Sequence, residues 1–154
     1  MQEMPKAAST RHYCGNVPLN GVISYYVGLA ERKMIRTEVK LGELPETLSG
    51  NEWEFATVIG NLLDNAVQAA AEVQPPEDRL VCIFGRQVGG QTLFEIRNTF
   101  SGSVAFDKRT RLPISSRGEG HGLGMQSVAE VVGRWNGTLD CGADGKWFFV
   151  RVLI

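Results

Sequence analysis

Residues 61–70 read NLLDNAVQAA, and they lie in the longest helical pattern of this 154-residue chain. Apolar residues recur around them at spacings of three and four: Phe55, Val58, Ile59, Leu62, Ala66, Ala69 and Val73. This spacing predicts a helix with one buried face. Asn51 is a good N-cap, and Pro75 and Pro76 end the pattern, so we expect the helix from Asn51 to about Val73.

A polar stripe runs beside this buried face. Its members are again spaced by three and four residues: Glu54, Thr57, Asn61, Asn65, Gln68 and Glu72. Asn61 and Asn65 are thus one turn apart and point the same way. Asparagine is a mediocre helix former because its amide competes with the backbone. Two interpretations are open: a solvated face, or an amide oxygen that binds Mg²⁺, which prefers oxygen ligands.

A glycine run precedes a second helical pattern. Residues 118–124 read GEGHGLG and hold four of the chain's 18 glycines. Alternating glycines let backbone N–H groups approach an anion, and a helix N-terminus adds partial positive charge. The run therefore favours a phosphate-binding loop, although such composition is also typical of flexible linkers. It is neither a P-loop nor a Rossmann fingerprint, because no GK[ST] follows and no strand precedes it.

The remaining pattern predicts one domain of α+β type. We expect a lead-in over residues 1–16, then one domain over 17–154. The expected elements are a helix at 18–35, a strand at 36–41, the central helix, a hairpin of strands at 80–87 and 92–98, an irregular lid at 99–122, a helix at 123–135, and strands at 138–141 and 146–154 around a turn at 142–145. This order predicts a two-layer sandwich, a mixed and mainly antiparallel sheet with helices on one face.

Composition excludes several classes of function. Sixteen Lys and Arg against seventeen Asp and Glu give a net charge of −1, which disfavours nucleic acid and anionic membranes as partners. The longest apolar runs, 81–84 and 147–150, are far shorter than the ~20 residues of a membrane span. Residues 1–16 contain no signal-peptide core. Three cysteines without a CxxC motif disfavour disulfides and zinc and fit a reducing cytoplasm.

Three motifs in order resemble the ATP-binding domain of the GHKL superfamily, which has the Bergerat fold. They are NLLDNAVQAA at 61–70, a strand ending in Asn98, and GHGLGMQSVAEVVGRWNG at 120–137. The likeness runs from about residue 13 to the end and is greatest to sensor histidine kinases of the quorum-sensing peptide-receptor kind. It implies a protein histidine kinase that uses ATP and Mg²⁺ and transfers the γ-phosphate to a histidine on a separate dimerisation domain of the same full-length kinase.

The resemblance also implies a setting for this domain. It would be the cytoplasmic, C-terminal part of a membrane-anchored sensor, with a downstream response regulator and no membrane or nucleic-acid contact of its own. Two alternatives remain open. One is a stand-alone GHKL serine kinase of the anti-sigma-factor type, and the other is a nucleotide-sensing module without phosphotransfer.

The resemblance assigns roles to three asparagines. Asn65 matches the family's Mg²⁺-binding residue. Asn61 matches a catalytic position that is a water-activating Glu in ATP-hydrolysing branches; an amide cannot take a proton, so phosphotransfer is favoured over hydrolysis. Asn98 stands where most of the family has an Asp that accepts a hydrogen bond from adenine, and its uncharged oxygen implies weaker adenine selectivity.

The glycine box supplies the rest of the implied site. Its nucleotide-binding residues are Gly118, Gly120, His121, Gly122, Leu123 and Gly124. His121 either contacts the nucleotide or caps the loop. Arg117 matches a basic lid position and is expected to contact the γ-phosphate, whereas Lys108, Arg109 and Arg111 fit a solvated lid face. His12 is not expected to be a phosphoacceptor, because no Asp follows it.

Overall fold

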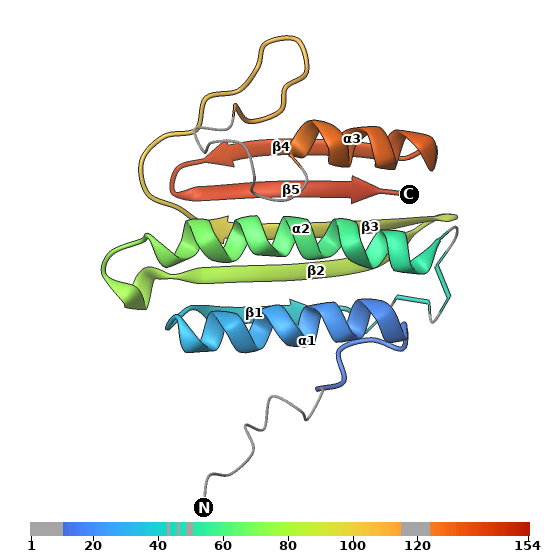
Figure 1. The fold of residues 1–154 in the computed structure, drawn as a ribbon, viewed down its shortest axis with the longest axis horizontal. Coiled ribbons are helices and arrows are strands. Elements are labelled where there is room, and N and C mark those ends of the chain that lie inside the picture. Colours follow the sequence, from blue (N-terminus) through green and yellow to red (C-terminus); the bar gives the residue numbers. More distant parts are fainter. Residues whose placement is uncertain (1–10, 43, 46, 49–50, 115–123) are drawn as a thin grey trace, which may run out of the picture.

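The described residues form one sheet, which three α-helices cover on one face (Figure 1). The computed structural model describes residues 11–42, 44–45, 47–48, 51–114 and 124–154. The helices are α1 (Val17–Arg32), α2 (Glu52–Ala71) and α3 (Met125–Arg134), with a short 3-10 helix, η2 (Pro76–Asp78). The strands are β1 (Arg36–Lys40), β2 (Leu80–Val88), β3 (Gln91–Thr99), β4 (Thr138–Asp144) and β5 (Trp147–Leu153).

The sheet is mixed. Its strand order is β1-β2-β3-β5-β4, with β1 parallel to β2 and every other neighbouring pair antiparallel. The predicted two-layer α+β sandwich with helices on one face is thus confirmed. None of the helices in the described ranges is long and apolar enough to cross a membrane.

The central helix α2 begins where the sequence predicts. Asn51 Oδ1 accepts hydrogen bonds from the N–H groups of Trp53 and Glu54, each at 3.1 Å. Glu52 and Glu54 place negative charge in the first turn, which the helix dipole favours. On the inner side, Phe55 packs edge-on against Phe94 of β3, with ring centroids 6.0 Å apart. The helix is therefore anchored over the middle of the sheet.

The lead-in contains a segment that packs on α1. Asn20 Oδ1 accepts from the N–H of Tyr13 at 2.7 Å, and its Nδ2 donates to the carbonyl of Arg11 at 2.9 Å. Arg11 also pairs with Glu31 at 2.6 Å. Asn16 then caps α1 through the N–H of Leu19. Residues 11–16 are therefore held against α1 by these contacts.

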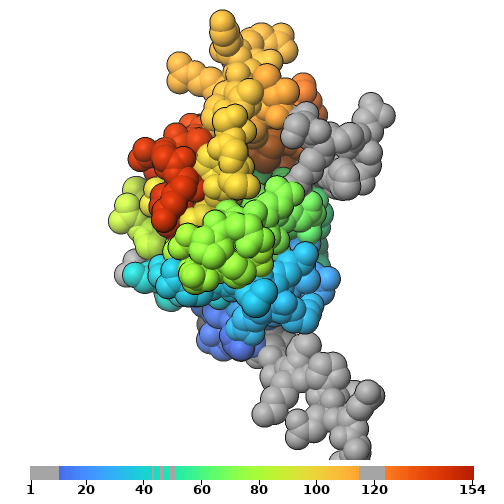
Figure 2. All heavy atoms as spheres, turned by 90° about the vertical axis from the view of Figure 1, so that its left-hand side faces the viewer, coloured from blue at the N-terminus to red at the C-terminus, as the bar shows by residue number. Residues whose placement is uncertain are grey.

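The lid segment contains a hairpin that the sequence analysis did not predict. Phe106 and Pro113 form a β-bridge, and the N–H of Ile114 donates to the carbonyl of Ala105 at 2.8 Å. The Asp107 carboxylate accepts from two backbone N–H groups of the turn. The expectation of an irregular segment is therefore wrong for residues 105–114, which stand out from the body at the top of Figure 2.

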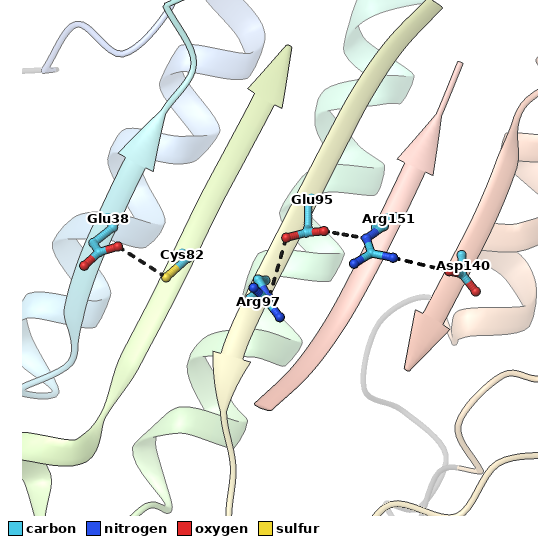
Figure 3. A network of polar contacts seen from close by, with 6 residues as sticks. All are labelled: Glu38, Cys82, Glu95, Arg97, Asp140 and Arg151. Carbon is cyan, nitrogen blue, oxygen red and sulfur yellow. Dashed lines mark hydrogen bonds and ion pairs between the residues drawn. The ribbon is translucent and has the colours of Figure 1, made fainter. Parts of the chain in front are cut away.

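The uncovered face of the sheet carries a polar network (Figure 3). Its six members are Glu38, Cys82, Glu95, Arg97, Asp140 and Arg151. Arg151 Nε donates to Glu95 at 2.5 Å, while its guanidinium lies 4.3 Å from the centroid of the Phe149 ring. Arg97 lies in the same way over Trp147, at 5.7 Å. Guanidinium groups thus shield the aromatic rings of this face, and the hydrophobic core lies on the helix side.

The turn predicted at 142–145 is wrong in part, because β4 continues to Asp144. Gly142 pairs with Phe149 across the strands, and a side chain at Gly142 would collide with the Phe149 ring. This glycine marks a close cross-strand contact and not a turn.

Candidate functional site

A cavity of about 290 Å³ lies beside α2, over β3 and β5, and reaches the start of α3. Its lining comes from all of these elements and from the lid: Leu62, Asn65, Ala66, Ala69, Glu72, Ile96, Asn98, Phe100, Ser101, Ser103, Val104, Pro113, Ile114, Gly124, Met125, Phe148 and Val150. This volume is close to the lower end of the range for small-molecule sites, about 300–1,000 Å³. The fold therefore provides a preformed hollow on its helix side.

The floor of the cavity is apolar. Ile96 of β3 and Val150 of β5 are paired across the strands and are both buried. Phe148 lies beside them, and its ring stacks on Phe106 of the hairpin with centroids 6.4 Å apart and planes inclined by 19°. The hairpin thus supports one wall of the cavity. Such a floor suits a flat, weakly polar group such as a heterocyclic base.

Asn98 places a polar group in this apolar surrounding. Its side chain is 2% exposed, and β5 holds it opposite Phe148. The Asn98 Nδ2 donates to the carbonyl of Thr99 at 3.0 Å, which leaves the amide oxygen as the group's acceptor. Thr99 is itself fixed, because its hydroxyl accepts from the N–H of Leu80 at 3.0 Å. The arrangement is suited to accept a hydrogen bond from an exocyclic amino group.

The two asparagines of α2 line different hollows. Asn65 is half-buried and lines the cavity, whereas Asn61 lines a groove between α2 and α1. The Asn61 Nδ2 donates back to the carbonyl of Thr57 at 3.0 Å. Each residue of an α-helix advances about 100° around the axis, so residues four apart differ in direction by about 40°. A stripe at this spacing therefore turns gradually around α2. Asn65 and Asn98 are brought together, and Asn61 lies one step around the helix from them.

The N-terminus of α3 borders the same cavity. Gly124 is its N-cap residue, and both Gly124 and Met125 line the cavity. No side chain of the described residues caps this end, so its N–H groups and the positive end of the helix dipole are suited to an anion. The other predicted glycine-box residues and Arg117 lie outside the described residues: Gly118, Gly120, His121, Gly122 and Leu123.

The cavity lining suits a cation that takes few ligands from the protein and further ligands from bound phosphate. Within the described ranges, no group of three or more His, Cys, Asp or Glu residues is placed to hold a metal ion. Mg²⁺ commonly takes one or two protein oxygens and completes its shell with water and phosphate. The amide oxygen of Asn65, on the same cavity as the α3 N-terminus, fits that mode of binding.

Burial disfavours the thiolate form of the three cysteines. All three are free. Burial raises the pKa of Cys82 to about 11 and that of Cys141 to about 12, and burial also raises the pKa of Cys14. These thiols therefore stay protonated at neutral pH.

Sequence reasoning missed the aromatic and lid residues of the cavity wall. Phe148, Val150 and Val152 alternate along the last strand, and this pattern places all three on the inner face. No local sequence pattern predicts the contact between Phe106 and Phe148. The two residues are 42 positions apart, and the hairpin brings them together. Lys108, Arg109 and Arg111 are exposed on that hairpin, as predicted.

Comparison with known proteins identifies the family. The family model described as the GHKL domain matches residues 51–154, so the chain belongs to the GHKL family. No curated protein matches the chain.

Solved structures of histidine kinases share the fold. The catalytic domain of histidine kinase ThkA has a TM-score of 0.66 and 14% identity, with 90% of each chain covered. Full-length ShkA in complex with AMPPNP has a TM-score of 0.69 and 21% identity over 89% of this chain and 29% of ShkA. Acinetobacter baumannii histidine kinase AdeS has a TM-score of 0.61 and 16% identity over 86% of this chain and 62% of that one. The chain thus spans less than two thirds of AdeS and less than one third of full-length ShkA.

These comparisons confirm the family and the Bergerat-type fold that the sequence predicts. The peptide-receptor subgroup and the roles of individual residues remain predictions.

Proposed function

We propose that this chain binds ATP with Mg²⁺ in the cavity beside α2 and transfers the γ-phosphate to a histidine on a separate dimerisation domain. One observation carries the proposal: in a GHKL chain, Asn65, Asn98 and the N-terminus of α3 line a single cavity. These groups come from three separate elements, and together they suit a metal, a base and an anion.

The base belongs on the apolar floor. Adenine carries an exocyclic amino group, and the Asn98 oxygen is the acceptor for it. The bond from Asn98 Nδ2 to the Thr99 carbonyl orients the amide. A base with a carbonyl oxygen in place of the amino group of adenine, such as guanine, would therefore place its oxygen against the Asn98 oxygen, and two acceptors cannot form a hydrogen bond. Adenine is therefore favoured over guanine.

The phosphates belong between Asn65 and the N-terminus of α3. Mg²⁺, when bound, neutralises developing charge on the transferred phosphoryl group. Asn65 would provide a metal ligand, and the N–H groups at Gly124 and Met125 would bind phosphate oxygens. The glycine run and Arg117 complete the phosphate site in this proposal, as the family resemblance implies.

Transfer is favoured over hydrolysis because Asn61 has no basic group. An amide does not remove a proton from water, whereas positioning and charge neutralisation are sufficient for phosphoryl transfer. In the full-length kinase this domain would be the cytoplasmic part of a membrane-anchored sensor, and its phosphate would pass to a response regulator.

A reconstituted phosphotransfer reaction tests the proposal. The chain is mixed with the dimerisation segment of its full-length kinase and radiolabelled ATP at tens of micromolar, because untethered domains forgo the effective concentration of a linker. We expect acid-labile, base-stable label on the segment, absent when its histidine is replaced by alanine. Acid-stable label on a serine would favour the serine-kinase alternative. Nucleotide binding without any transfer would favour the nucleotide-sensing module.

A further inference from the structure

A second hollow lies between α1 and α2, whose N-termini lie at the same end of the molecule (Figure 1). It measures about 340 Å³, and eight of the described residues line it, none of them charged. Pro18, Val22 and Tyr26 form the α1 wall at four-residue spacing. Trp53 and Asn61 lie on the α2 side, and the hollow is called the α1–α2 groove below.

Small residues form the α2 side of the floor. Ala56 and Gly60 are one turn apart on α2 and both are buried. A Cβ added at Gly60 would lie 3.4 Å from Val22 Cγ1 and 3.7 Å from Tyr26 Cε2, which are ordinary contact distances. One methyl group thus fits here, whereas a larger side chain would extend into the groove.

The rim of the groove carries an exposed aromatic anchor. Trp53 is 72% exposed, the highest value among the aromatic residues of the described chain. The polar groups beside it are engaged along α2: the Thr57 hydroxyl donates to the carbonyl of Trp53 at 2.9 Å, and Asn61 Nδ2 donates to that of Thr57 at 3.0 Å. The groove therefore presents apolar surface with a tryptophan at its edge, a composition typical of binding hot spots.

We propose that the α1–α2 groove binds apolar side chains of the histidine-bearing helix that receives the phosphate. This inference rests on the proposed function. Asn61 lines the groove and Asn65 lines the nucleotide cavity, and four residues of α2 span only about 6 Å. The groove therefore ends one helical turn of α2 from Asn65, the proposed metal ligand.

The size of the groove favours a tethered, transient partner over a permanent dimer. The eight lining residues within the described ranges are far fewer than the roughly 20–30 per side of a stable interface. Tethering within one polypeptide raises the effective concentration and makes such a small contact sufficient. Structures of the same fold occur within longer chains, and this chain spans only 29% of full-length ShkA. The uncharged lining matches the apolar face of an amphipathic helix.

Two variants and one control test the groove. Trp53→Ser removes the anchor, and Gly60→Leu fills the floor. Met34→Asn is the control, because Met34 is 65% exposed, follows the C-terminus of α1, and has a positive φ of 57° that asparagine tolerates. Each protein is loaded with AMPPNP and Mg²⁺ and titrated calorimetrically with the dimerisation segment. We expect at least tenfold weaker segment binding for both groove variants, unchanged binding for the control, and unchanged AMPPNP affinity in all three.

The outcomes separate this inference from the proposed function. Equal segment binding by the parent chain and both groove variants would overturn the inference, and the proposed function would stand if phosphate still transferred. Loss of transfer with groove-dependent segment binding intact would overturn the proposed function instead. Self-association of the chain that Trp53→Ser abolishes would assign the groove to a second copy and overturn the inference. Thermal denaturation identifies a misfolded Gly60→Leu protein, and Trp53→Ser then decides alone.

Discussion

Replacing Asn98 by leucine is expected to reduce base selectivity while leaving the fold intact. Leucine has a similar shape, and the site is 2% exposed. The substitution removes one hydrogen bond, that from Nδ2 to the Thr99 carbonyl, worth about 0.5–1.5 kcal/mol net. The apolar side chain gains burial against Ile96 and Phe148, which offsets part of this loss. We therefore expect a fall of no more than about 1–2 kcal/mol in the free energy of unfolding.

The effect on nucleotide affinity is expected to be larger. Without the Asn98 oxygen, the adenine amino group is buried without a partner, at a cost of about 1–3 kcal/mol. This corresponds to roughly 5- to 150-fold weaker binding.

Calorimetric titration with AMPPNP and with GMPPNP measures both affinities. The parent chain should prefer AMPPNP, and Asn98→Leu should reduce that preference. Ser103→Ala is the matched control, because Ser103 lines the cavity from an exposed position. An unchanged ratio of the two affinities in Asn98→Leu would refute the placement of the base at Asn98.

Three further predictions concern other parts of the chain. Asp107→Ala should increase hydrogen exchange at Arg109 and Thr110, because the N–H groups of Thr110 and Arg109 bond to this carboxylate and lower its pKa; unchanged exchange would contradict the structure of the turn. Burial raises the pKa of Cys141 to about 12, so the free energy of unfolding should fall as pH rises from about 9 toward 12, because only the unfolded thiol ionises there. Urea titrations of Cys141→Ala should show a smaller alkaline decline, and an equal decline would exclude this thiol as a cause. His12→Ala should leave reconstituted phosphotransfer unchanged, whereas self-labelling of the chain that this substitution abolishes would make His12 the acceptor.

Local signals in the sequence predicted most of the fold. Asn51 identifies the start of α2 because a side-chain oxygen bonds N–H groups two and three residues later, which is a short-range interaction. Asn98 was assigned through the family resemblance, because it stands where most GHKL domains have an Asp. The helix start needs only neighbouring residues, whereas the role of Asn98 needs the order of three motifs along the chain.

The features that were missed depend on distant contacts or on accumulated geometry. The turn of the 105–114 hairpin is held by hydrogen bonds to the Asp107 carboxylate. Such bonds require no regular spacing of apolar residues, so the hydrophobic pattern did not predict this hairpin. The spacing of Asn61 and Asn65 suggested one face, but the rotation of about 40° per step puts them on different hollows. The groove itself requires α1 and α2 to lie side by side, which no local pattern specifies.

The most direct test of the account measures whether the chain binds one nucleotide in a Mg²⁺-dependent way and whether this dependence requires Asn65. The parent chain and Asn65→Ala are titrated calorimetrically with AMPPNP, with and without Mg²⁺, with Gln126→Ala as a control from an exposed position on α3. The account predicts one site in the parent chain, tighter binding with Mg²⁺, and loss of most of that metal dependence in Asn65→Ala at an unchanged melting temperature. Unchanged affinity in Asn65→Ala with its full metal dependence would contradict it.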